Sequence, residues 1–306
     1  MHAAVSSPAA FGAVYPGDIS AFPIYPAGVN LDSALAPHAQ QRGAGDLAFE
    51  RAGAATVLRT ARSTSPLRLL TPRNHGHAAW VFAATFGGGL VDGDTVRLDV
   101  TLAPGSTSLV GTQASTKVYR CPTSTCRQDL VARVGSSALL VLVPDPVVCF
   151  AEARYEQSIA VDLAPGASLV LVDTFTAGRS ARGERWQFAR YAARLAVTRQ
   201  GAPLLHDAMI LDPAHGALAP RFGRFDAVAT IVLFGPQARS LRAHAIERAP
   251  APSRASAIVE AVSPIGDDGA LIRIAGASIE ATSAAVRGYL AELGAILGDD
   301  PFARKW

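Results

Sequence analysis

Short apolar segments that recur along the chain constrain its fold more than any other feature of the sequence. From Leu47 to about Phe234, runs rich in Val, Leu, Thr and Arg alternate with Gly, Pro and Asp roughly every ten residues, the rhythm of strands joined by turns. Residues 95–102 alternate polar and apolar, as a strand with one buried face does. No convincing helical period interrupts these segments, which argues against a parallel sheet assembled from strand-helix-strand units. The sequence therefore predicts a mainly β body.

The C-terminal region has a different pattern. Apolar residues at helical spacing predict helices over 237–248 and 278–297, the second with Ser278 as its cap and Gly298 as its stop. Between the two helices, strand-like runs on either side of residues 266–269 predict a hairpin. We therefore expect helices and a hairpin to follow the β body.

The N-terminal region has no such pattern. Residues 1–45 are rich in Ala, Pro, Gly and Ser, and no helical or alternating period survives their five prolines. We expect a flexible extension at 1–45 and a single domain at 46–306, in which the β body covers about 46–234 and the helices and hairpin about 235–306.

Composition argues against several classes of protein. The 28 basic residues exceed the 25 acidic ones by only three, so a cationic nucleic-acid binder is not expected. The longest apolar runs, such as 138–143, are far shorter than the roughly 18 residues of a membrane span. No Lys or Arg precedes Arg42, so the cationic region of a secretory signal is missing. Because an odd number of cysteines, three, also indicates a reduced compartment, we expect a cytoplasmic protein with no membrane or nucleic-acid partner.

Three glycines followed by two carboxylates form the most unusual local feature, in residues 87–94. The segment lacks the Lys-Ser/Thr ending of a phosphate-binding loop, and Asp92 stands where a dinucleotide-binding motif needs Gly. In an extended segment Asp92 and Asp94 point the same way, whereas in a tight turn both are solvated. The sequence alone leaves both alternatives open.

A second dense group of polar residues lies in 111–120. If this segment is a strand, Thr112 and Thr116 share one face, while Lys117 and Tyr119 share the other. Such a row of polar side chains lines a water-filled cavity or faces solvent, and the sequence does not decide between the two.

Two further segments carry charge. Asp145 lies between two prolines, which make its backbone rigid and extended. Residues 173–184 bring Asp173, Arg179, Glu184 and a second arginine around two glycines. The second segment is typical of a functional loop or of a self-neutralised cluster of ion pairs.

Signatures of a metal site or of a catalytic nucleophile are poor. Cys121 and Cys126 are not followed by a second pair of ligands, as a zinc knuckle requires. The sequence contains no Gly-x-Ser-x-Gly elbow and no His-Glu-x-x-His helix. We therefore do not expect an enzyme.

Taken in order, these segments resemble the UreD family of urease accessory proteins, also called UreH. The resemblance runs from about Leu47 through the C-terminal helix. The segments that carry it are Ser65-Pro66-Leu67-Arg68-Leu69, residues 87–94, residues 112–120, Gln128, Pro144-Asp145-Pro146, Tyr155, Gln157, Asp173, Gly178-Arg179 and Gly183-Glu184.

The resemblance implies a fold and a function. The fold is a many-stranded, two-layered β body with β-helix-like winding and C-terminal α-helices. The function is that of a non-catalytic chaperone that binds urease apoprotein and UreF-type and UreG-type accessory proteins, and that helps to deliver nickel to the urease site through a polar channel. Nickel would be cargo in transit, with no tightly bound cofactor.

The resemblance also assigns residues. The positions that match the family motifs, and that are candidates for the channel lining, are Asp92, Asp94, Lys117, Tyr119, Asp145, Asp173, Arg179 and Glu184. Carboxylates hold Ni²⁺ more weakly than imidazole or thiolate ligands do, so transient nickel sites are expected at Asp92, Asp94 and Glu184 and no tight site is expected. Candidate contacts to partner proteins are Arg287, Tyr289 and Leu290 on the predicted C-terminal helix.

Two other functions remain open on the residues alone. A hydrolase could use carboxylate pairs among Asp92, Asp94, Asp145 and Glu184 for acid and base catalysis. The second alternative is a β-rich scaffold without any role in metal transfer, which would not require these side chains to lie close together.

Overall fold

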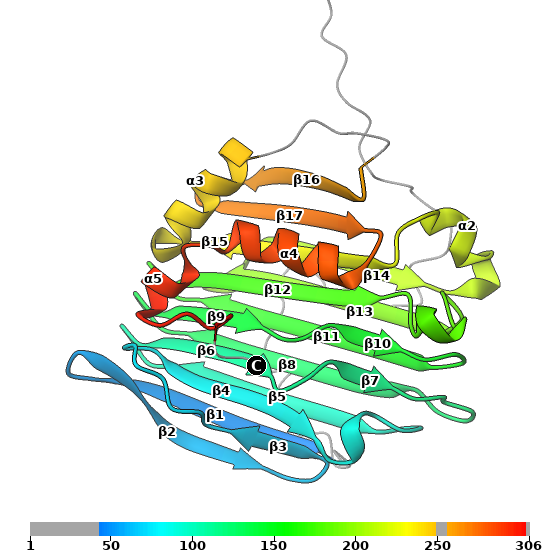
Figure 1. Cartoon of the computed structure of the whole chain (residues 1–306). Helices are drawn as coiled ribbons and strands as arrows, with labels where there is room; N and C mark the ends of the chain where they lie inside the picture. Colours follow the sequence, from blue (N-terminus) through cyan, green and yellow to red (C-terminus); the bar gives the residue numbers. More distant parts are fainter. Residues whose placement is uncertain (1–42, 249–255, 304–306) are drawn as a thin grey trace, which may run out of the picture.

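The fold is built from two stacked β-sheets through which the chain winds back and forth (Figure 1). The computed structural model describes residues 43–248 and 256–303. The first sheet has seven strands in the order β14-β13-β11-β8-β5-β1-β2. Its strands are β1 (Gly43–Ala52), β2 (Ala55–Ser63), β5 (Thr95–Leu102), β8 (Cys126–Val134), β11 (Arg154–Leu163), β13 (Arg190–Arg199) and β14 (Ala202–Leu211).

The second sheet has ten strands. Eight of them follow the order β16-β17-β15-β12-β9-β6-β4-β3, and the short strands β7 and β10 pair beside β12. Its strands are β3 (Leu67–Leu70), β4 (Ala79–Thr85), β6 (Thr107–Thr112), β7 (Thr116–Val118), β9 (Leu139–Val143), β10 (Val147–Cys149), β12 (Ser168–Thr176), β15 (Ala227–Phe234), β16 (Ile258–Ile265) and β17 (Gly269–Gly276).

From β4 to β13 the chain passes repeatedly from one sheet to the other. Strands that are separated by one turn of this winding therefore become parallel neighbours in the same sheet. In the first sheet β5, β8, β11 and β13 pair in parallel, and in the second sheet β4, β6, β9 and β12 do the same. Parallel neighbours here need no crossover helix, because each connection is a strand of the other sheet. The predicted mainly β, two-layered body with helix-like winding is confirmed.

The interior between the sheets follows from the period-two pattern. In β11, every second side chain from Tyr155 to Leu163 is buried, whereas the residues between them are partly exposed. Strands β12 and β15 are instead buried almost throughout, because both faces of the second sheet are covered. One core therefore lies between the sheets, and a second lies on the outer face of the second sheet.

Three C-terminal helices cover that outer face: α3 (Arg239–Arg248), α4 (Ile279–Tyr289) and α5 (Leu293–Leu297) (Figure 1). Ser278 caps α4 by accepting a hydrogen bond from the Ala281 N–H, at 3.2 Å, and Gly298 ends α5 in the left-handed conformation, as predicted. The single predicted helix over 278–297 is wrong, because the helix is interrupted after Tyr289.

Within residues 43–248 and 256–303, the remaining helical segments are a five-residue helix, α2 (Leu218–Phe222), and four short 3₁₀ turns. These turns are η2 (Phe86–Gly88), η3 (Ser180–Arg182), η4 (Pro213–His215) and η5 (Pro236–Ala238). No helix in the described ranges is both long enough and apolar enough to cross a membrane.

The proposed N-terminal extension falls mostly outside the described residues, which begin at Gly43. Gly43 is already part of β1, whose parallel pairing with β5 places Gly45 opposite Leu98. A Cβ atom at Gly45 would come within 2.5 Å of the Leu67 side chain, so this strand needs glycine where the two sheets approach each other. The strand that begins the body thus starts a few residues before position 46.

Candidate functional site

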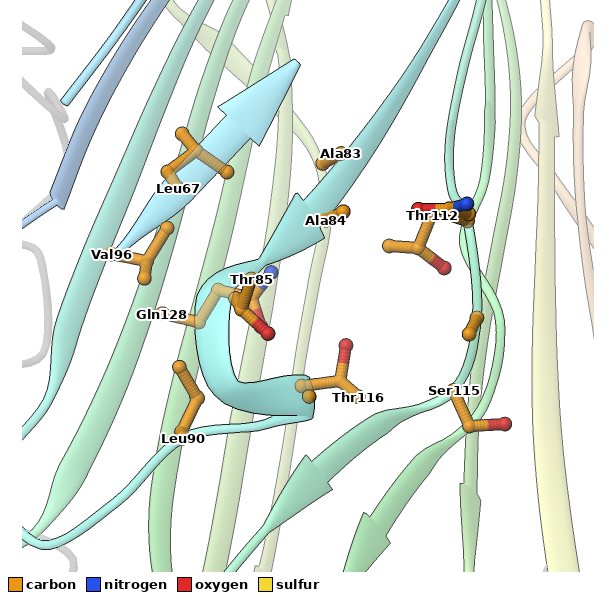
Figure 2. Close-up of a pocket in the computed structure, with 13 residues that line it drawn as sticks. Leu67, Ala83, Ala84, Thr85, Leu90, Val96, Thr112, Ser115, Thr116 and Gln128 are labelled. Carbon is orange, nitrogen blue, oxygen red and sulfur yellow. The ribbon is translucent and has the colours of Figure 1, made fainter. Parts of the chain in front are cut away.

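A cavity with both polar and apolar lining residues lies between the two sheets and has two adjoining compartments. The outer compartment has a volume of about 160 Å³ and is lined by residues of β3, β4, β6 and β8 and of the loop after β6 (Figure 2). Its lining includes the exposed residues Gln113 and Ala114, so it reaches the protein surface. The inner compartment, of about 50 Å³, extends toward β11 and β12 and shares Ala83, Thr112, Thr116 and Gln128 with the outer one.

Asp145 enters the inner compartment from the segment between β9 and β10. The Asp145 carboxylate accepts a hydrogen bond from the Thr112 hydroxyl (2.9 Å), and the backbone N–H of Asp145 donates to the Thr112 hydroxyl oxygen (2.7 Å). Pro144 and Pro146 hold the backbone extended, so that the N–H of Asp145 reaches Thr112 at the end of β6. With only 8% of its surface exposed, Asp145 is a buried carboxylate on the cavity wall.

Asp173 enters the same compartment from β12. Its Oδ1 accepts a hydrogen bond from Gln157 Nε2 on β11, at 3.0 Å. Burial away from water raises the pKa of Asp173 above its ordinary value, against a smaller lowering by the Gln157 hydrogen bond. Asp173 is therefore a carboxylate whose charge is poorly solvated unless a cation approaches it.

A hydrogen-bonded chain continues from Asp173 along the floor of the cavity. The hydroxyl of Tyr155, which is fully buried, lies 2.9 Å from the Oε1 position of Gln157 and 2.9 Å from that of Gln128. Burial raises the pKa of Tyr155 well above its ordinary value, so the phenol keeps its proton. Two strands of the first sheet, β8 and β11, and one of the second, β12, thus bring these four side chains together.

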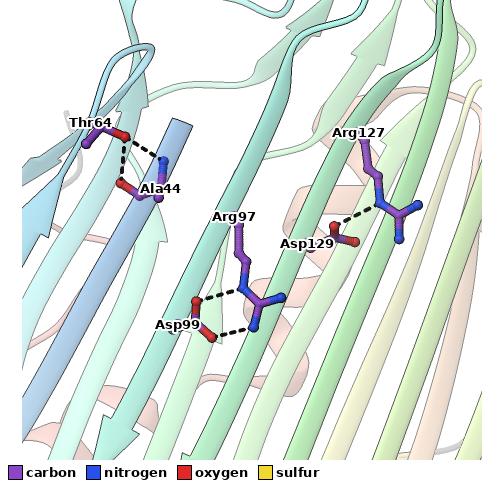
Figure 3. Close-up of polar contacts among 6 residues, drawn as sticks. All are labelled: Ala44, Thr64, Arg97, Asp99, Arg127 and Asp129. Atoms are coloured by element: carbon purple, nitrogen blue, oxygen red, sulfur yellow. Dashed lines mark hydrogen bonds and ion pairs between the residues drawn. The ribbon is translucent and has the colours of Figure 1, made fainter. Parts of the chain in front are cut away.

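Charged residues of β8 lie on the opposite face of the strand. Arg127 and Asp129 flank Gln128 and form an ion pair with a 2.8 Å contact, next to the two hydrogen bonds that join Arg97 to Asp99 on β5 (Figure 3). Because successive side chains of a strand point to opposite faces, Gln128 faces the cavity and the paired charges face outward. The two ion pairs on β5 and β8 therefore lie on the face of the sheet that points away from the cavity.

Other candidate residues lie in corner loops, by which we mean the connections that follow β4, β7, β10 and β12 at one end of the body. The Asp92 carboxylate accepts hydrogen bonds from the backbone N–H groups of Thr123 and Ser124, at 3.2 and 2.7 Å, and from the Thr123 hydroxyl. The Thr123 hydroxyl makes the largest contribution to lowering the pKa of Asp92. Asp94 accepts from the Val91 N–H at 2.9 Å. Both carboxylates therefore hold corner loops in place.

Arg179 and Glu184 form an ion pair within the corner loop after β12. Arg179 Nε lies 2.8 Å from Glu184 Oε2, and its guanidinium stacks over the Phe150 ring at 3.9 Å. Glu184 also accepts from the Ala151 N–H, and the hydrogen bond from Arg179 lowers its pKa. Tyr119 packs edge-on against Phe150, with ring centroids 5.1 Å apart. These contacts join each corner loop to the next, as an ion-pair cluster does.

Comparison with known proteins identifies the family. A family model described as "UreD urease accessory protein" matches residues 41–306. A urease accessory protein UreD of Sorangium cellulosum is 53% identical over 281 residues, which cover 92% of this chain and 90% of that protein. A urease accessory protein UreD of Anaeromyxobacter is 42% identical over 86% of this chain and 89% of its own length. A urease accessory protein D of rice is 33% identical over 78% and 88%, respectively.

The chain belongs to the UreD family. Its members are named as accessory proteins of urease, so a role in urease maturation follows for this chain, and the resemblance inferred from the motifs is confirmed.

The cavity gathers only part of the residues that the UreD motifs mark. Asp145 and Asp173 line the inner compartment, together with the motif residues Gln128 and Gln157. The six other candidates lie outside both compartments, in the corner loops or beside them: Asp92, Asp94, Lys117, Tyr119, Arg179 and Glu184. The carboxylates that a hydrolase would pair are thus divided between two corner loops and the cavity.

The cavity is also lined by residues that were not among the channel candidates, chiefly Thr112, Thr116 and Gln128, and Tyr155 lies behind Gln128. If residues 111–120 form a strand, Thr112 and Thr116 share one face, which allows for a water-filled cavity there, so a signal for these two exists in the sequence. Gln128 and Tyr155 belong to the family motifs, but their residue types and spacing do not show that the two side chains meet, because this depends on which strands become neighbours.

The three candidate partner contacts of the UreD chain are not equivalent. Arg287 is exposed, whereas Tyr289 and Leu290 are 0% and 1% exposed and pack in the core beneath the helices. The Tyr289 hydroxyl donates to Glu260 at 3.3 Å. In this fold a partner protein can contact Arg287, but it cannot contact Tyr289 or Leu290 without displacing α4.

The metal-ligating side chains of the UreD chain are dispersed. Within residues 43–248 and 256–303, no group of three or more His, Cys, Asp or Glu side chains is placed to hold a metal ion. Cys121 and Cys126 are buried, with their sulfur atoms 3.4 Å apart, and burial raises the pKa of Cys126 to about 12. The Cys126 thiol therefore stays protonated at neutral pH, and a protonated thiol is a poor metal ligand.

Proposed function

We propose that this chain is a urease maturation chaperone that binds urease apoprotein and passes nickel to it through the cavity between the two sheets. In this proposal nickel enters the outer compartment and moves past Asp145 and Asp173, and UreF-type and UreG-type accessory proteins dock on the chain while the ion is transferred. All three cysteines are free, which fits a reduced compartment and thus the cytoplasm as the place of this work.

The observation that carries the proposal is the chemistry of the cavity wall. Its polar groups are carboxylate, hydroxyl and amide oxygens of residues such as Asp145, Thr112 and Asp173, with no imidazole or thiolate among the lining residues. Oxygen ligands hold Ni²⁺ more weakly than nitrogen or sulfur ligands do, so an ion can bind and leave. The desolvated carboxylate of Asp173 gains most from a nearby cation, because the ion supplies the charge partner that burial denies it.

The test is a reconstitution from purified components: urease apoprotein, UreF-type and UreG-type proteins, Ni²⁺ and this chain. Asp145→Asn and Asp173→Asn keep the size and one acceptor oxygen of each side chain but remove the charge. We expect complexes containing these variants to assemble normally and to give urease with several-fold less nickel, as measured by elemental analysis.

The matched control is Asp46→Asn, which removes a charge from an exposed position of β1 outside the cavity. Normal nickel transfer by this control, with a loss in the two cavity variants, would support the cavity route. Equal transfer by all three variants would exclude that route, and failure of the wild-type chain to associate with urease apoprotein would exclude the function itself. Urease that acquires nickel equally well without this chain would favour a scaffold.

A further inference from the structure

Gln128 lies where the two compartments of the cavity meet, since it lines both of them. A glutamine amide has one end that attracts cations, the carbonyl oxygen, and one end that repels them, the NH₂ group. The orientation of this amide therefore determines whether the shared part of the cavity favours or opposes a positive ion at Gln128.

Hydrogen bonding fixes that orientation. The carboxyl of Asp173 accepts from Gln157 Nε2 at 3.0 Å, which leaves Gln157 Oε1 facing the Tyr155 hydroxyl at 2.9 Å. The phenol has a single proton, which it donates to Gln157. The Oε1 position of Gln128 lies 2.9 Å from the same phenol oxygen. Because the phenol proton is already used, an oxygen at that position would have no hydrogen between it and the phenol. We therefore assign the Gln128 amide the flipped orientation, in which its NH₂ group donates to the phenol oxygen. The carbonyl oxygen of Gln128 then points away from Tyr155, toward the cavity.

Burial and ring packing hold the hydrogen-bonded side chains in place, so the orientation of the Gln128 amide is maintained. Tyr155 is fully buried, Gln157 is 8% exposed, and the Tyr155 ring packs against that of Tyr191 with centroids 5.8 Å apart. Burial keeps Tyr155 protonated, so its hydroxyl always has one proton to donate. Rotation of the Gln128 amide, which is partly exposed, would bring its carbonyl oxygen against the phenol oxygen with no proton between them, and this disfavours the rotated state.

We propose that Tyr155 is a positioning residue that turns the carbonyl oxygen of Gln128 toward a divalent cation in the cavity, beside Thr112 and Asp145. The inference rests on the proposed function, because it assumes that the cavity accepts such an ion. A neutral carbonyl ligand adds affinity without adding charge, which suits an ion that must leave again.

The test measures Ni²⁺ binding to the purified full-length chain by titration calorimetry. Tyr155→Phe removes the hydroxyl and keeps the ring. Loss of an outer partner that orients a ligand lowers metal affinity by about 10-fold or more, and we expect a loss of that size here. The matched control is Tyr191→Phe, because the Tyr191 hydroxyl is buried beside the same ring and has no hydrogen-bond partner among the described residues. Tyr191→Phe should leave the affinity unchanged.

A rescue separates positioning from mere packing. In the Tyr155→Phe background, Gln128→Glu presents an oxygen to the cavity whichever way its side chain is turned, so most of the lost affinity should return. Wild-type affinity in Tyr155→Phe, an equal loss in Tyr191→Phe, or no recovery with Gln128→Glu would each overturn the inference.

The same titrations distinguish this inference from the function on which it rests. Asp145→Asn defines the part of Ni²⁺ binding that depends on the cavity. If wild-type and Asp145→Asn chains bind identically, the cavity is not a nickel site, and both proposals fail. If Asp145→Asn loses affinity and Tyr155→Phe does not, only the role of Tyr155 fails.

Discussion

Replacing Asp173 with Asn should make the protein more stable and less able to transfer nickel. Asn keeps an oxygen that accepts from Gln157, so the 3.0 Å hydrogen bond survives. What is lost is the negative charge, which burial disfavours and which no ion pair with a basic side chain offsets in the described part of the chain. A residue retained for stability alone would not show these opposite effects.

The magnitude follows from the raised pKa of Asp173. Each unit by which the folded pKa exceeds the unfolded value of about 3.9 costs the folded state about 1.4 kcal/mol at neutral pH. For a domain of this size, that energy corresponds to roughly 3–6 °C in the unfolding midpoint. Asn does not ionise, so Asp173→Asn should recover this energy and raise the midpoint at neutral pH.

The pH dependence of the stability difference between wild type and variant provides a second check on the sign of that difference. Below about pH 3.9 the Asp173 carboxyl is protonated in both states, and the wild type and the variant should unfold alike. As pH rises above that value, the unfolded chain loses its proton first while the folded chain still holds one, so the wild type loses stability relative to the variant. The difference becomes constant once Asp173 is ionised in the folded state as well.

The assay is thermal unfolding of both proteins, followed by circular dichroism between about pH 4 and pH 8, with nickel transfer measured on the same samples. We expect a midpoint difference that grows from near zero to its neutral-pH value. A variant that is less stable at neutral pH, or a difference that does not change with pH, would refute the argument from burial. A more stable variant that transfers nickel normally would refute the role of Asp173 in transfer.

Three further predictions concern stability and reactivity. Leu290→Ala should cost about 2–5 kcal/mol, because its side chain is 1% exposed in the core, whereas exposed Arg287→Ala should leave the thermal midpoint almost unchanged; equal midpoints would contradict the core role. Ser278→Ala should cost about 1 kcal/mol in urea unfolding through loss of the hydrogen bond from Ala281, and Ser278→Asn should restore it. Because burial raises the pKa of Cys126 to about 12, a disulfide reagent at pH 8 should label it slowly in the folded chain and rapidly in denaturant; fast labelling of the folded chain would argue against this burial.

The sequence predicts most strands correctly, because a half-buried strand has a local period that is visible without its neighbours. The alternation in β5 (Thr95–Leu102) and the turn between β16 and β17 are examples. The interruption of the C-terminal helix after Tyr289 is missed, because the apolar spacing continues across it.

Parallel pairing has no comparable local signal. Tyr155 lies opposite Cys126 only because one winding of the chain stacks on the previous one. The same limit applies to the candidate site. Asp145 is identifiable by its two flanking prolines. Asp173 and Gln128 are both marked by the family motif, but Gln128 is not among the channel candidates, because it stands between two charged residues on a strand. Tyr289 and Leu290, which we expected at a partner interface, are buried in this fold, because the apolar spacing of a helix marks the face that packs on its own sheet.

The covering of the second sheet by α3, α4 and α5 has a consequence for how the protein is made. A ribosome releases α3 only after β15, and α4 and α5 only after β17, so most of the covered strands are completed before the helices that cover them. Until then, the outer face of that sheet exposes Leu109, Val141, Val172 and Ile231 to water, a surface prone to self-association. A nascent or truncated chain that ends before Arg239 should therefore aggregate or recruit general folding helpers, and synthesis beside a protein that shields this face should raise its yield.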